Sequence, residues 1–75
     1  MKFNEIMPGM WAAVAGKFSF VITNEKGTYA ASYKDVEFKG EQSSNFIEDS
    51  QNNPFKTYHH ARMACIRKYK ELKLN

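Results

Sequence analysis

Two adjacent histidines and a single cysteine are the residues best suited to metal chemistry in this chain. His59 and His60 precede Cys65, and the chain has no second cysteine and no further histidine. Imidazole and thiolate both bind zinc, but a structural zinc site needs four ligands. In a helix, the spacing turns His60 and Cys65 to different faces. We therefore expect no metal site and interpret Cys65 as a small core residue.

Catalysis by a nucleophile or by a pair of carboxylates is not indicated either. A thiol on the apolar face of a helix is poorly ionised, and no orienting base is evident for it. The carboxylates are interpreted as ordinary solvent-exposed side chains: Asp35 and Glu37 lie beside a predicted strand, and Glu48 and Asp49 lie in a polar loop. The four glycines are separate turn markers and form no phosphate-binding loop. The sequence predicts a protein that is not an enzyme, with no cofactor and no small-molecule substrate.

Positive charge is concentrated in the last third of the chain. Residues 54–75 contain six basic residues and one acid, whereas residues 1–53 contain five lysines and seven acids. Such a segment can contact phosphates, with Tyr58 or His59 adding stacking interactions. At 100° per residue, however, the cations spread around a helix, so a solvated surface is preferred and nucleic-acid binding is the alternative. The candidate nucleic-acid contacts are Lys56, Arg62, Arg67, Lys68, Lys70 and Lys73.

The elements that would position these residues follow from the apolar pattern. The 75 residues are enough for one domain, and 43% of them are hydrophobic, as in folded proteins. Turn signals and alternation predict strands at about 10–15, 18–23 and 28–34, with a further strand at 36–39 left open. A loop at 40–53 is expected to be pinned by Phe46 and Ile47, and a short helical turn there is equally compatible.

A helix is predicted over about 55–72. It begins either with Pro54 as its first helical residue or with Thr57 as its N-cap. One helical stripe would cover the sheet; it contains Tyr58, Ala61, Cys65, Tyr69 and Leu72. The predicted fold class is α+β, with a three- to four-stranded antiparallel meander covered on one face by a single C-terminal helix.

The predicted hairpin registers separate large side chains from small ones. A two-residue turn at Gly16 and Lys17 places Ala13 opposite Phe20, and a turn at 24–27 places Ile22 opposite Tyr29. The aromatic residues then share the covered face. The second face carries small side chains and is the candidate protein interface: Ala12, Val14, Ser19, Val21, Thr23, Thr28, Ala30 and Ser32.

Trp11 opens a predicted strand, the run 27–32 reads Gly-Thr-Tyr-Ala-Ala-Ser, and the step 55–57 reads Phe-Lys-Thr before a predicted helix. The order of these signals resembles that of small β-β-β-α proteins of bacteriophages and mobile elements. The outline is similar to that of arm-type DNA-binding domains of integrases. That resemblance implies three strands with a closing helix, and DNA reading by basic and aromatic side chains on the exposed sheet face. This chain has Ser, Thr, Ala and Val at those positions.

The preferred functional hypothesis is therefore a small non-enzymatic protein-binding module. It would be a phage or mobile-element accessory protein that binds and modulates a host or viral protein, or associates with itself. The first residues lack the apolar run of a signal peptide, and no segment has the eighteen apolar residues of a membrane span. The single cysteine allows no disulfide within the chain. We expect a cytoplasmic location and no membrane partner.

Overall fold

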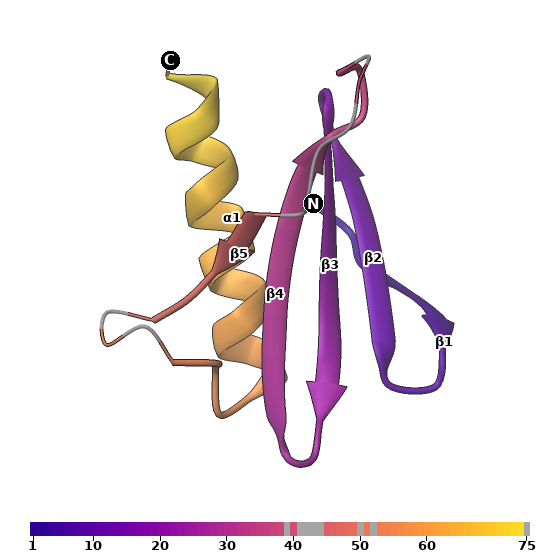
Figure 1. Cartoon of the computed structure of the whole chain (residues 1–75), viewed down its shortest axis with the longest axis vertical. Coiled ribbons are helices and arrows are strands. Elements are labelled where there is room, and N and C mark those ends of the chain that lie inside the picture. Colours follow the sequence, from indigo (N-terminus) through magenta and orange to yellow (C-terminus); the bar gives the residue numbers. More distant parts are fainter. Residues whose placement is uncertain (39, 41–44, 50, 52, 75) are drawn as a thin grey trace.

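An antiparallel sheet and one helix make up the protein (Figure 1). The computed structural model describes residues 1–38, 40, 45–49, 51, 53 and 54–74. Within them, five strands pair in chain order and the helix follows, so the α+β class is confirmed with five strands instead of three or four. The elements are β1 (Asn4–Met7), β2 (Met10–Ala15), β3 (Phe18–Glu25), β4 (Thr28–Asp35), β5 (Asn45–Ile47) and α1 (Tyr58–Lys73).

The β2–β3 hairpin has the register predicted from the sequence. Ala13 pairs with Phe20, and the strands are joined through the two residues Gly16 and Lys17. Gly16 has a φ of 60°, a conformation that favours glycine. A Cβ atom at Gly16 would also lie 3.0 Å from the hydroxyl oxygen of Tyr69 in α1. This turn therefore lies close against the helix.

The β3–β4 hairpin differs from the prediction by two residues. Ile22 pairs with Ala31 and not with Tyr29, because the turn consists only of Lys26 and Gly27. Both residues have positive φ, 54° and 91°, as the tight hairpin turn with two left-handed residues requires. A shift of two residues keeps every side chain on its predicted face. The separation of the two faces is thus unaffected.

Lys26 is a suboptimal residue for this turn, which gives a stability prediction. Because asparagine enters the left-handed region more readily than lysine, Lys26→Asn should raise the free energy of unfolding by about 0.5 kcal/mol. Urea denaturation measures the change. Lys17→Asn is the matched control in the other turn, where φ is not positive, and it should bring no gain. An equal gain at both positions would contradict the explanation.

Strand β1 was not predicted, and it extends the sheet beyond β2. Pro8 and Gly9 turn the chain between β1 and β2, and the amide of Asn24 donates a 2.7 Å hydrogen bond to the carbonyl of Gly9. The β1–β2 register shifts between Glu5 and Met7, which marks a bulge. The turn is therefore tied to the end of β3.

The segment after β4 does not continue as the strand considered at 36–39. Val36 donates its amide to the carbonyl of Lys17 at 2.8 Å, and the carboxylate of Asp35 accepts the amide of Glu37 at 2.9 Å. These bonds bend the chain into a turn at residues 36–37, while position 39 lies outside the described residues. That strand prediction is wrong for residues 36–38.

The predicted 40–53 loop contains the short strand β5. Its register places Ile47 opposite Ala31 and Phe46 opposite Ser32 in β4. The alternative of a helical turn at Phe46 is therefore wrong. Phe46 and Ile47 do fix the middle of this segment, because Ile47 is buried while Phe46 points to the other face.

The helix starts later than residue 55 because Phe55 is held by the sheet. Tyr29 and Phe55 exchange two backbone hydrogen bonds of 2.7 and 2.9 Å as an isolated bridge at the edge of β4. An extended residue cannot belong to the helix, so the prediction with Pro54 at the first helical position is wrong. Thr57 is the N-cap, and its hydroxyl accepts the amide of His60 at 3.1 Å.

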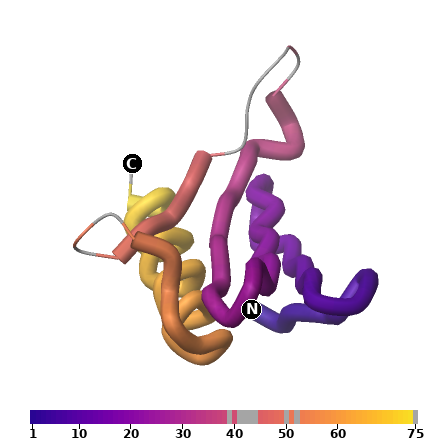
Figure 2. The backbone as a smooth tube through the Cα atoms, turned by 60° about the horizontal axis from the view of Figure 1, so that its bottom comes forward, coloured from indigo at the N-terminus to yellow at the C-terminus, as the bar shows by residue number. Residues whose placement is uncertain are grey.

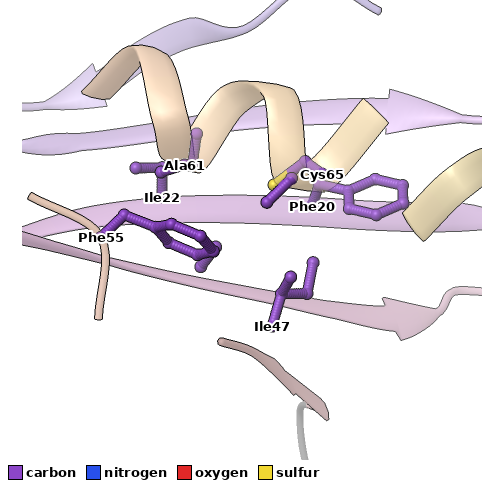
Figure 3. Packing of buried hydrophobic residues seen from close by; sticks show 8 residues of the cluster. Phe20, Ile22, Ile47, Phe55, Ala61 and Cys65 are labelled. Carbon is purple, nitrogen blue, oxygen red and sulfur yellow. The ribbon is translucent and has the colours of Figure 1, made fainter. Parts of the chain in front are cut away.

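The core lies between α1 and one face of the sheet. Phe20 and Ile22 of β3 point toward Ala61 and Cys65 of α1, and all four are fully buried (Figure 3). The helix packs on β3, β4 and β5, whereas the β1–β2 hairpin lies at the opposite end of the sheet (Figure 2). The predicted helical stripe is confirmed, because its outer members also pack against the core: Tyr58, Tyr69 and Leu72.

Candidate functional site

Cys65 occupies the centre of the core and is unsuited to nucleophilic chemistry. Its side chain is fully buried, and this burial raises the pKa of the thiol from 9.0 to about 12. His59 and His60 are exposed at the start of α1. The described residues include no group of three or more His, Cys, Asp or Glu arranged to hold a metal ion.

Two of the carboxylates considered above stabilise turns. Asp35 forms an ion pair of 3.5 Å with Lys17 in addition to its bond with the amide of Glu37. Asp49 accepts the amides of Gln51 and Asn53, both at 2.9 Å. Each carboxylate is thus engaged by nearby backbone amides, in the manner that favours Asp in turns.

The basic side chains of α1 differ in their contacts and in their exposure to solvent. Lys68 forms an ion pair of 3.1 Å with Glu71, and the ammonium of Lys73 lies 5.3 Å from the ring centre of Tyr69. Arg62 is half-buried, whereas Arg67 and Lys70 are exposed. Nucleic-acid contact by the six predicted residues stays a prediction.

A groove of about 560 Å³ lies between α1 and the segment around β5. Its lining includes Lys56, Arg67 and Lys68, which are among the predicted nucleic-acid contacts, but also Glu48 and Asp49. Glu71, on the same rim, is already paired with Lys68. Positive and negative side chains therefore line the groove together, and the net charge of its lining is close to zero.

The face of the sheet opposite α1 is the second surface that the sequence singled out. The registers place all eight predicted residues on this face, because they alternate with the buried residues of β2, β3 and β4. Val14 is 70% exposed and the other seven are half-buried. We call this surface the open face; its predicted members are Ala12, Val14, Ser19, Val21, Thr23, Thr28, Ala30 and Ser32.

The structure adds larger apolar residues to the open face. Phe46 pairs with Ser32 and is 72% exposed, and Met10 pairs with Thr23 and with the exposed Met7. Sequence reasoning missed Met7 and Phe46 because β1 and β5 were not predicted, and it left out Met10 although the predicted strand at 10–15 begins with this residue. For Phe46 the available signal was the apolar pair Phe46 and Ile47 in a polar segment, since adjacent strand residues point to opposite faces.

The fold and this face together define a small α+β domain with one uncovered sheet surface. Comparison of the chain with protein-family models, with curated proteins and with solved structures finds no significant match. In the described part of the chain, no helix is long and apolar enough to cross a membrane.

Proposed function

We propose that the protein is a non-enzymatic binding module that presents the open face of its sheet to another protein surface. The observation that carries the proposal is the exposure of Val14 and Phe46, at 70% and 72%, on a sheet face whose centre consists of small side chains. In the setting suggested by the phage and mobile-element resemblance, the module is an accessory protein that associates with itself through this face or binds a host or viral protein.

The chemistry of the open face supports protein binding better than contact with a charged polymer. Its centre is made of Ala, Val, Ser and Thr side chains. Removing water from these small side chains costs little free energy, and their size lets a flat partner approach closely. Apolar side chains at its margins, such as Val14 and Phe46, provide area that favours association once it is buried. Both properties suit a protein surface.

Site-specific photo-cross-linking in the cell of origin tests this proposal. A photoreactive amino acid in place of Val14 should give a cross-linked polypeptide, whereas the same residue in place of Lys70, exposed on α1, should not. Val21→Lys should remove the cross-link from position 14, because it adds a charge to the middle of the contact.

The fold of each variant is checked by circular dichroism, since Val21 is only half-buried and its replacement should leave the helix and sheet in place. Equal cross-linking from positions 14 and 70, or none from position 14, would contradict the proposal.

A further inference from the structure

The open face is built in rows that cross the whole sheet. Successive registers connect Ala12 with Val21, Val21 with Ser32, and Ser32 with Phe46. The next row connects Met10, Thr23 and Ala30. From β2 to β5 these two rows carry no charge and, apart from Met10 and Phe46, consist of small side chains, so the middle of the face is flat and neutral.

Charge is confined to the two ends of this face. Among the strand residues on it, only Lys34 and Glu25 are charged, and both are exposed. Lys34 pairs with Ser19 at one end of β3, while Glu25 pairs with Thr28 at the other. Ser19 and Glu25 are six positions apart along β3, which is about 20 Å. Neither charge has an ion-pair partner within the described residues.

The exposed area of the protein is large for its mass. A compact monomer of 8.7 kDa exposes about 4,700 Å², whereas this protein exposes 5448 Å². The excess of about 700 Å² is close to the roughly 800 Å² that each partner contributes to an interface of standard size. This excess belongs to the surface as a whole, and the exposed Val14 and Phe46 of the open face contribute to it.

We infer that the occupant of the open face is a second copy of this chain, related by a two-fold axis that runs across the strands between the two central rows. The inference rests on the proposed function, since it names the partner of the same face. This axis reverses the strand direction, so Lys34 of each copy comes beside Glu25 of the other. An axis parallel to the strands would instead bring like charges together.

The same axis matches the sizes of the side chains along the centre. Val21 of one copy lies over Thr23 of the other, and Ser32 lies over Ala30, because the axis passes at the level of Ile22 on the buried side. A two-fold interface has to be complementary to itself. Opposite charges at the two ends of a neutral centre give the face that property.

Sedimentation equilibrium of the full chain tests the inference through a charge-reversal cycle. Lys34→Glu and Glu25→Lys should each weaken the dimer roughly ten-fold or more, since each creates two like-charge contacts. The double variant should return the dissociation constant to within about three-fold of the original, because both pairs are restored in reverse. Lys70→Glu on α1 makes the same charge change away from the face and should have no effect.

Three outcomes would overturn the inference. They are a monomer at all accessible concentrations, a dimer that Lys34→Glu does not weaken, and single variants that the double variant does not rescue. A monomer that still cross-links from position 14 to a different polypeptide would refute the second copy alone and leave the proposed function standing. A monomer without that cross-link would refute both.

Discussion

Replacing Phe20 with alanine is expected to lower the free energy of unfolding by about 3–5 kcal/mol. Phe20 is fully buried at the centre of β3, and its ring lies 5.9 Å from that of Tyr33 and 6.2 Å from that of Tyr69. Its pairing partner in β2 is Ala13, whose side chain is too short to fill the cavity that loss of the ring would leave. The loss therefore includes both the transfer of the ring and an unrepaired cavity.

A chain of this size leaves little reserve against such a loss. Domains of 75 residues are stable by about 5–10 kcal/mol, so the substitution removes a large fraction of the total free energy of unfolding. Urea denaturation followed by the fluorescence of Trp11, which lies 4.9 Å from Tyr58 at the edge of the core, measures the change.

Phe46→Ala is the matched control for the Phe20 variant. It removes the same side chain from a position that is 72% exposed, and in dilute solution it should change stability by less than about 0.5 kcal/mol. A loss at Phe46 as large as that at Phe20 would contradict the assignment of the two faces of the sheet.

The thiol of Cys65 is expected to be almost inert in the folded protein. A pKa shifted from 9.0 to about 12 reduces the thiolate fraction at neutral pH about a thousand-fold, and burial excludes the reagent as well. Alkylation by iodoacetamide should therefore proceed at least about a thousand-fold more slowly in buffer than in denaturant. Rapid native alkylation would contradict a buried, protonated thiol.

The same shift makes stability depend on alkaline pH. Between pH 9.0 and 12 the folded state keeps the proton of Cys65 while the unfolded chain loses it. The contribution of Cys65 to stability is thus fully present below pH 9 and declines as the pH rises toward 12. Cys65→Ala should show a shallower decline over this interval, since the two proteins differ in no other side chain. Identical slopes would contradict the shift.

The apolar alternation of the strands could be interpreted from the sequence because it is a local property. Phe18, Phe20 and Ile22 alternate with Ser19 and Val21, which fixes two faces whatever the exact register. The helical stripe around Cys65 was equally evident, since its spacing of three and four residues has no other regular explanation. The eight candidate residues of the open face were found in this way.

The second turn shows where local patterns become insufficient. The residues from Asn24 to Gly27 are compatible with a four-residue turn or with a two-residue turn. The two-residue turn differs in that it requires a positive φ, and therefore backbone strain, at Lys26. That strain is offset by two additional strand pairs, Glu25 with Thr28 and Asn24 with Tyr29. The local sequence does not show that these pairs form.

Strands β1 and β5 exist because of partners distant in the chain. Asn4–Met7 has no alternating pattern and forms a strand against β2, while Asn45–Ile47 does so against β4. In the same way Phe55 is kept out of the helix by its two hydrogen bonds to Tyr29. Short strands gain their stability from pairing and from the burial of a few side chains, not from intrinsic preference.

The sequence by itself thus determined the class of the fold, the two faces of the sheet and the buried stripe of the helix. Only the tertiary structure decided the five-strand width, the second register and the rows that place Lys34 and Glu25 at opposite ends of the open face. The physical reason is that side-chain alternation is encoded within each strand, whereas pairing depends on contacts between segments that the local sequence does not specify.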